Sequence, residues 1–188
     1  MIEQSDFFKY ASVESKEAFL HHSKKRTISE GDVLFRERQK AEHVFYVVSG
    51  AVSFTFHDEE GKSFIIGIAA ANTFIGELEA FNEGPRISQA VALQESEVLA
   101  IRKEQFIEIF GKDTSALLYF VRYYAKELQF LMRFSLVMDV DKRSLSHWFI
   151  WQIASEKTHQ TVFVLTLPFH KKHSQQWWVS QGKELTDF

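Results

Sequence analysis

Apolar and polar positions follow two different periods along the chain. From Arg26 to Arg102, short runs rich in Val, Ile and Phe are separated by turn signals such as "EGD", "SG", "DEEGK", "AAN" and "NEGP". Evenly spaced strands of this kind predict a β sandwich or jelly roll. Gly50 lies between "HVFYVVSG" and "AVSFTFHD", where a residue without a Cβ permits a tight reversal. Before these strands, "SVESKEAFLHHS" predicts a short helix that begins after Ser12.

A helical period begins at Lys103. "KEQFIEIF" predicts one short helix, and Asp113 or Thr114 can cap a longer helix that runs to about Val137. Apolar residues recur along the longer helix at alternating steps of four and three, then at a step of seven, at Leu117, Val121, Tyr124, Leu128, Leu131 and Met138. This spacing is typical of a coiled-coil seam, although a stripe that packs on the sandwich would look the same.

The same helix carries further apolar residues off this seam, at Leu118, Phe120 and Phe130. It therefore has apolar surface for its own domain as well as for a partner, which favours a homodimer. Beyond it, a further helix is expected from near Asp141, and "TVFVLTLP" reads as a strand ended by Pro168. The chain is thus expected to divide into a sensor domain with an N-terminal helix over 1–112, a dimerisation helix over 113–138 and a C-terminal module over 139–188.

Composition excludes several kinds of protein. The chain has 188 residues, 45% of them apolar and 19 of them Phe, which is enough for a hydrophobic core. Its apolar runs fall short of the roughly 18 residues that a spanning helix needs, and its N-terminus does not resemble a secretory signal. The absence of Cys excludes disulfides and thiol catalysis and indicates a cytoplasmic protein. A formal charge of −3 weighs against nucleic-acid binding by the chain as a whole but leaves a local basic element possible.

One loop between two apolar runs, "FIGELEAFNEGPRISQAVA", is rich in glycine and charged residues. It holds two of the eight Gly, one of the two Pro, three acids and one Arg. Gly76 would let a ligand approach the backbone, and a helical turn over 78–81 would aim N–H groups at an anion. Arg86 would grip that anion as a fork, while Glu77 would accept hydrogen bonds from sugar hydroxyls. This arrangement suits a phosphate joined to a ribose.

At these residues the sequence resembles the Crp/Fnr family of bacterial transcription regulators. The matching pieces are "EGDVLF", "VFYVVSGAVSF", "FIGELEAF", "RISQAVA" and "SEVLAIRKEQF", and "LVMDVDKRSLSHWF" resembles the hinge and following helix. The resemblance implies a mainly β fold with helices: a cyclic-nucleotide-binding-type β roll, a long dimerisation helix and a C-terminal winged helix-turn-helix. It implies Gly76 and Glu77 at the ribose and Arg86 at the cyclic phosphate, within an effector site formed by Gly76, Glu77, Leu78, Arg86, Ile87 and Ser88.

Two departures separate this chain from cyclic-nucleotide binders of that family. Where those proteins usually follow the Arg with a small hydroxyl residue, this chain has Ile87, whose side chain cannot donate a hydrogen bond. Where cyclic-AMP receptors place hydroxyls on the long helix to read adenine, this chain has "FLMRF". An ion pair between Glu77 and Arg86 that only braces the roll is therefore the alternative to nucleotide binding.

The C-terminal residues, "FHKKHSQQWWVSQGKELTDF", depart most from the family. They hold no Arg for a guanine edge, so this chain as written is expected to bind DNA poorly. Reading the codons of Trp177, Trp178 and Val179 one base earlier forces Val and Gly. The same frame permits every position of the family's DNA-reading motif, and loss of one A from the codons of Lys171 and Lys172 would produce the switch. A frameshifted helix-turn-helix and a genuine native tail both remain open.

The sequence contains no recognisable set of catalytic residues. "HKKH" places His170 and His173 three residues apart, but a solvated basic turn accounts for it and no third ligand is evident. A metal enzyme on this fold would need a close His-x-His pair and a Glu, whereas His43 and His57 stand alone. We therefore expect no metal, no catalytic residues and no enzyme activity. The expected protein is an effector-controlled, DNA-binding homodimer, and the alternative is a sensor or interaction module that acts without DNA.

Overall fold

The computed structural model describes residues 5–57 and 63–137. Five helices lie within them: α1 (Asp6–Tyr10), α2 (Val13–His22), α3 (Leu78–Asn82), α4 (Lys103–Phe110) and α5 (Thr114–Val137). The strands are β1 (Lys24–Ile28), β2 (Val33–Phe35), β3 (His43–Ser49), β4 (Ala51–His57), β5 (Ser63–Ala70), β6 (Phe74–Ile75), β7 (Gln89–Ala92) and β8 (Ser96–Arg102). The predicted order of short helix, β strands and long helix is confirmed, while the short helix α1 has no counterpart in the sequence analysis.

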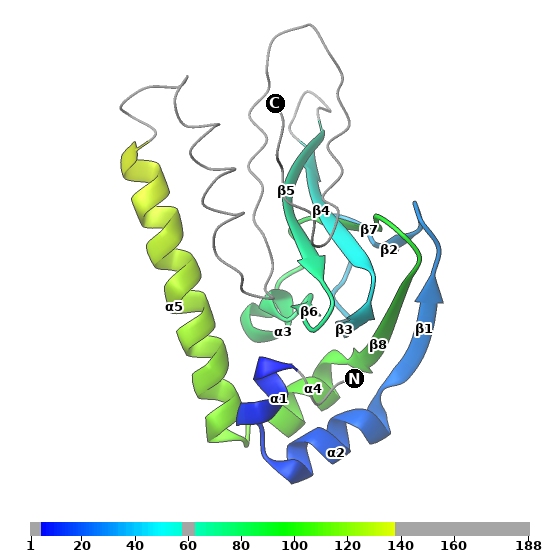
Figure 1. Ribbon diagram of the computed structural model, residues 1–188, viewed down its shortest axis with the longest axis vertical. Helices are drawn as coiled ribbons and strands as arrows, with labels where there is room; N and C mark the ends of the chain where they lie inside the picture. Colours follow the sequence, from blue (N-terminus) through cyan, green and yellow to red (C-terminus); the bar gives the residue numbers. More distant parts are fainter. Residues whose placement is uncertain (1–4, 58–62, 138–188) are drawn as a thin grey trace, which may run out of the picture.

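The strands form two antiparallel sheets that face each other as a roll (Figure 1). One sheet has the order β1-β8-β3-β6 and the other β2-β7-β4-β5. Gly50 joins β3 to β4 with a φ of +91°, and a Cβ there would lie 2.1 Å from Ser96 Oγ. That hydroxyl instead accepts a hydrogen bond of 3.1 Å from the Ala51 N–H. The predicted reversal at Gly50 is therefore needed both for its backbone angle and for close packing.

Two hydrophobic clusters hold the roll together. The smaller cluster lies between the sheets and includes Phe35, Phe45 and Val98. The larger one is dominated by aromatic rings and seats the helices on the roll, with Phe7, Phe19, Phe74, Phe106, Phe110 and Phe120 among its members. Their edge-to-face contacts add to simple area burial.

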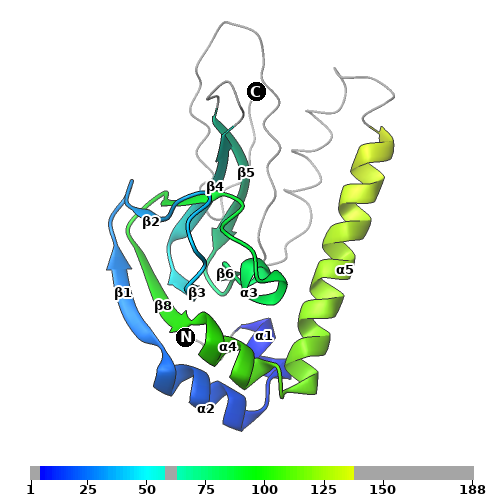
Figure 2. The same cartoon turned by 180° about the vertical axis from the view of Figure 1, so that it is seen from behind.

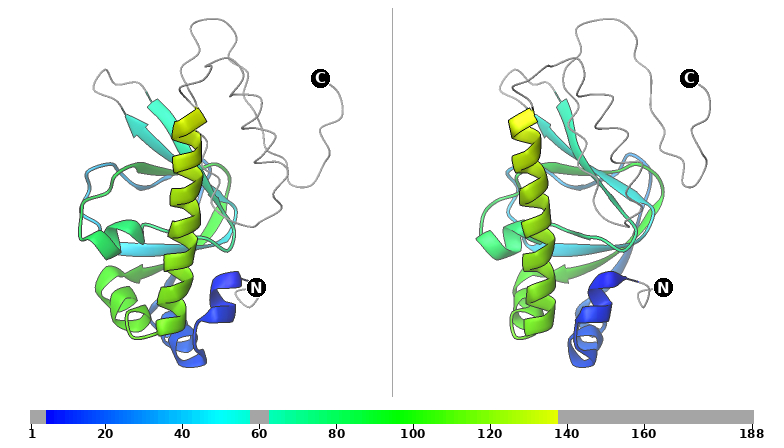
Figure 3. Two further views of the ribbon diagram at one scale, coloured as in Figure 1. Left: turned by 90° about the vertical axis from the view of Figure 1, so that its left-hand side faces the viewer. Right: turned by 60° about the vertical axis from the view of Figure 1, so that its left-hand side comes forward.

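Helix α5 runs along one side of the roll (Figure 1; Figure 2 from behind). It starts where α1, α2 and α4 gather and extends past α3 toward the β4–β5 end (Figure 3). Asp113 fixes its start, because one carboxylate oxygen accepts from the Ala116 N–H at 3.1 Å and the other from the Ser12 N–H at 2.7 Å. Burial alone would raise the pKa of Asp113, but these hydrogen bonds outweigh it and the pKa is lowered. Ser12 caps α2 as predicted, since its Oγ accepts from the Ser15 N–H.

The apolar faces of α5 divide differently from the expected seam. Ala116 and Phe120 are buried against the roll, and Tyr124 packs beside them. The exposed apolar side chains are Leu118, Val121, Leu128, Leu131 and Met132. Four of these, Leu118, Val121, Leu128 and Met132, fall on one stripe with Ala125 at alternating steps of three and four. We call these five residues the α5 stripe. Tyr124, which was expected on the seam, thus lies on the face that packs on the roll, and Leu118, which was expected off the seam, lies on the exposed face. The roll covers part of the expected seam, so the exposed apolar stripe lies one row further around the helix.

Several expectations lie outside the described residues. They concern Met138, the helix from Asp141, the His170 and His173 pair and the whole C-terminal module over 139–188. Within residues 5–57 and 63–137, no helix has both the length and the hydropathy to cross a bilayer.

Candidate functional site

The loop between β6 and β7 turns its Arg inward. Arg86 is only 3% exposed, and its guanidinium lies 4.0 Å from the centre of the Phe35 ring. Nη1 donates to the Gly76 carbonyl at 3.1 Å, and Nη2 donates to the His43 carbonyl. Its backbone is also fixed, because the Arg86 N–H donates to the Gln39 carbonyl at 2.9 Å. Burial lowers the pKa of Arg86, while the neighbouring Glu79 opposes this shift.

The ion-pair partner of Arg86 is Glu79. Nη1 of Arg86 lies 3.0 Å from Oε2 of Glu79, and both side chains are almost fully buried. The other carboxylate oxygen, Oε1, accepts a hydrogen bond of 3.2 Å from the Ile87 N–H. Glu79 therefore bridges the side chain of one residue and the backbone of the next. Glu79 is not among the predicted site residues, although an acid within a short helical turn of a loop with one Arg was a usable signal.

Gly76 leaves room for the guanidinium of Arg86. Its φ is +80°, and a Cβ at this position would lie 2.1 Å from Nη1 of Arg86. The space beside the Gly76 backbone, where a ligand was expected to approach, is thus occupied by the Arg86 guanidinium. The N–H groups of Ala80 and Phe81 are also used within the turn, since both donate to the Glu77 carbonyl.

Glu77 faces helix α5. Its Oε1 accepts a hydrogen bond of 2.9 Å from the Tyr124 hydroxyl, and its Oε2 is buried without a hydrogen-bond partner among the described residues. Burial raises the pKa of Glu77 from 4.5 to about 7, although the Tyr124 hydrogen bond acts in the opposite direction. Burial, together with Glu77, also raises the pKa of the Tyr124 hydroxyl. This partly buried hydrogen bond therefore joins the loop to the long helix.

The six predicted effector residues divide by exposure. Leu78 and Ile87 present large exposed apolar side chains, whereas Glu77, Arg86 and Ser88 are buried. Gly76 and Arg86 are in direct contact. The alternative expectation was an ion pair between Glu77 and Arg86 that braces the roll. The structure has a buried ion pair to Arg86, but the acid that forms it is Glu79 rather than Glu77.

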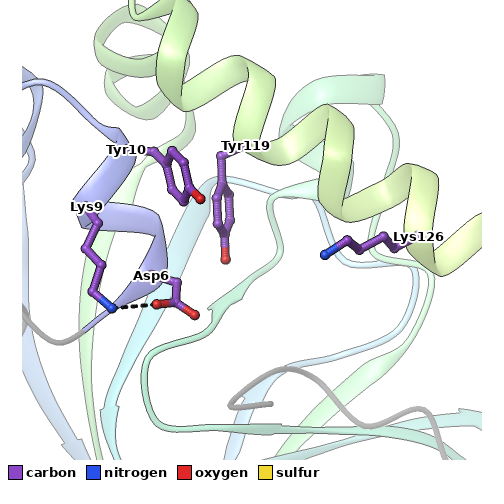
Figure 4. Close-up of a pocket in the computed structure, with 5 residues that line it drawn as sticks. All are labelled: Asp6, Lys9, Tyr10, Tyr119 and Lys126. Atoms are coloured by element: carbon purple, nitrogen blue, oxygen red, sulfur yellow. Dashed lines mark hydrogen bonds and ion pairs between the residues drawn. The ribbon is translucent and has the colours of Figure 1, made fainter. Parts of the chain in front are cut away.

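A separate cleft of about 370 Å³ lies between α1 and α5 (Figure 4). It is lined by Asp6, Lys9, Tyr10, Tyr119 and Lys126, and Lys9 and Asp6 form an ion pair of 2.7 Å at its side. None of the predicted effector residues lines it. In the part of the chain that the structure describes, no group of three or more His, Asp or Glu side chains is arranged to hold a metal ion.

Comparison with known proteins defines the class of this fold. Residues 25–113 match the family model described as "Cyclic nucleotide-binding domain". The two facing sheets and flanking helices thus form a β roll of the cyclic nucleotide-binding type, and the predicted fold class is confirmed.

Relatives of the chain are found among Crp-type regulators. The cAMP-activated global transcriptional regulator CRP of Salmonella typhimurium is 32% identical over 114 residues, which is 60% of this chain and 54% of CRP. The chain therefore spans about half the length of the curated relatives it matches.

Two solved structures share the fold at low sequence identity. The Thermus thermophilus Catabolite Activator Protein superimposes with a TM-score of 0.63 at 20% identity, over 71% of this chain and 63% of that protein. The regulatory subunit of a cAMP-independent protein kinase A from Trypanosoma brucei gives a TM-score of 0.58 at 17% identity, over 68% of this chain and 48% of that subunit.

Proposed function

We propose that this chain is the sensor and dimerisation part of a Crp/Fnr-type transcription regulator. In this proposal the β roll responds to a small effector, a cyclic nucleotide or another anion, at the loop of residues 76–88. The response passes to α5, which dimerises and sets the spacing of two C-terminal DNA-binding modules. The regulator acts in the cytoplasm and catalyses no reaction.

The Glu77–Tyr124 hydrogen bond carries this proposal. It is a direct, partly buried polar link of 2.9 Å between the loop and the long helix. A change at the loop that moves or ionises Glu77 alters the position that Tyr124 prefers. Because Val121 and Leu128 are the i−3 and i+4 neighbours of Tyr124 on the continuous helix α5, a shift at Tyr124 reaches the α5 stripe. The similarity to CRP over 114 residues supports the same conclusion.

The exposed face of α5 supports dimerisation. Val121 is 61% and Leu128 59% exposed, and both lie on the α5 stripe. Alternating steps of three and four residues suit a left-handed pair of helices. A second copy of α5 would cover side chains that otherwise meet water.

A second candidate function is a sensor module that acts without DNA. The observation that favours it is the Glu79–Arg86 ion pair, which fills the position expected for a ligand's phosphate. A cAMP-independent regulatory subunit with the same fold is a relevant parallel.

Resequencing the source gene separates the two functions. The region of interest covers the codons for His170 to Phe188 and about 150 bases beyond, roughly the length that completes a winged helix. We expect an extra A near the codons of Lys171 and Lys172, or a downstream frame that continues the DNA-reading motif. If the bases are as written and no such motif follows, the DNA-binding function is wrong and the sensor module replaces it.

A further inference from the structure

The carboxylate of Glu79 is held as an anionic ligand would be held. Its Oε2 lies 3.0 Å from Nη1 of Arg86, and its Oε1 accepts from the Ile87 N–H at 3.2 Å. A guanidinium and the N–H of the next residue therefore converge on the two oxygens of one anion. Charged hydrogen bonds of this kind suit phosphate and carboxylate equally well.

The remaining surroundings of the guanidinium are protein. The Gly76 and His43 carbonyls accept from its two terminal nitrogens, and Phe35 covers one face. Arg86 and Glu79 are each only 3% exposed. An external anion that used Nη1 and the Ile87 N–H together would have to occupy the place of the Glu79 carboxylate.

We propose that Glu79 determines the ligand specificity of this site, as a built-in anion that competes with the phosphate of any external ligand for Arg86 and Ile87. The inference rests on the proposed function, because it takes the Arg86 loop as the effector site. Glu79 has an advantage over a free ligand, since its tether gives it a high effective concentration. A bound phosphate would also leave the displaced carboxylate buried or force it outward, and both cost free energy.

Calorimetry with cyclic AMP and cyclic GMP tests this competition. We compare the unmodified chain with Glu79→Ala and with the control Glu83→Gln, which removes the same charge from an exposed position of the same loop. Glu79→Ala is expected to bind at least about tenfold more tightly than the other two. The double variant Glu79→Ala with Arg86→Met should lose that gain, because the guanidinium is the group set free.

Three outcomes would overturn the proposal. They are equal affinity in the unmodified chain and Glu79→Ala, a gain that survives in the double variant, and no binding by a folded Glu79→Ala.

Thermal unfolding checks whether the Glu79→Ala variant is folded, because this substitution leaves the buried Arg86 guanidinium without its ion-pair partner. Each protein is melted in sodium chloride and in inorganic phosphate of equal ionic strength. Phosphate is expected to raise the Tm of Glu79→Ala and to leave that of the unmodified chain unchanged. If Glu79→Ala does not fold, Glu79→Gln takes its place, since it keeps the size and removes the charge. An equal response in Glu79→Gln and the unmodified chain would overturn the proposal.

The proposal about Glu79 can be refuted without refuting the proposed function, and the reverse also holds. Dimer mass and the downstream reading frame report on α5 and the C-terminal module, whereas anion affinity reports on Arg86 alone. A gain in Glu79→Ala without dimerisation or a DNA-reading frame would refute the regulator and keep the role of Glu79. The reverse result would keep the regulator.

Discussion

The Tyr124 hydroxyl donates a hydrogen bond to the Glu77 carboxylate, with 2.9 Å between Tyr124 Oη and Glu77 Oε1. Glu77 directly precedes α3, and Tyr124 lies in the middle of α5, so this contact connects the loop of residues 76–88 to the long helix. Both groups are largely buried, and the second oxygen of Glu77 has no partner among the described residues. The relationship is therefore sensitive to protonation as well as to mutation.

Tyr124→Phe removes the donor from this contact. Because it leaves a buried carboxyl without a partner, we expect a loss of about 1–3 kcal/mol in the free energy of unfolding. The proposed function adds a second expectation, a weaker dimer in sedimentation equilibrium. Tyr10→Phe is the matched control, since it removes a hydroxyl from a half-exposed ring. Equal unfolding free energies for Tyr124→Phe and the control would contradict a structural role for the hydrogen bond.

Glu77 should make the protein less stable as the pH rises. Its pKa is about 7 in the folded chain against 4.5 ordinarily, so the folded state binds more protons between these values. The free energy of unfolding therefore falls across this window, by up to about 3 kcal/mol from this group alone. Urea unfolding at intervals from pH 4.5 to 8 measures the slope. Glu77→Gln should remove this part of the pH dependence, and an unchanged slope would refute the assignment.

Gly76→Ala and Gly31→Ala form a matched pair. Both glycines have φ near +80°, but a Cβ at Gly31 meets nothing within 4 Å whereas one at Gly76 meets the Arg86 guanidinium. Gly31→Ala should cost about 1–2 kcal/mol from backbone strain. Gly76→Ala should cost at least about 3 kcal/mol, because it also displaces a buried ion-paired group. Equal losses in chemical denaturation would show that Arg86 is not packed on Gly76 as described.

Leu128→Lys tests the α5 stripe. At tens of micromolar protein we expect the unmodified chain to sediment at twice its 21.9 kDa mass and Leu128→Lys to sediment at the single-chain mass. The Lys adds a charge within the proposed interface, and the side chain at position 128 is exposed rather than packed on the roll, so the Tm should change little. Gln129→Lys adds the same charge at the neighbouring exposed position and should remain dimeric. An unmodified chain near 22 kDa would remove the dimer from the proposal.

Much of the fold follows from local signals in the sequence. The short apolar runs and turn signals over residues 26–102, the glycine at position 50 and the caps at Ser12 and Asp113 all act within a few residues. Each is reproduced in the structure. Local signals are reliable here because backbone angles and capping hydrogen bonds depend on near neighbours in the chain. The helix α1 was missed because five residues are too few to show a period.

The partners inside the site depended on distant contacts. The sequence was enough to predict that Gly76, Glu77 and Arg86 share one loop and that α5 is apolar on more than one face. The folded chain was needed to show that Arg86 pairs with Glu79 and that Glu77 pairs with Tyr124. These pairings depend on packing, because Glu77 and Glu79 are only two residues apart in the same loop and the roll determines which carboxylate points toward Arg86 and which toward α5. The same packing rotates α5 and thereby selects the apolar stripe that remains exposed.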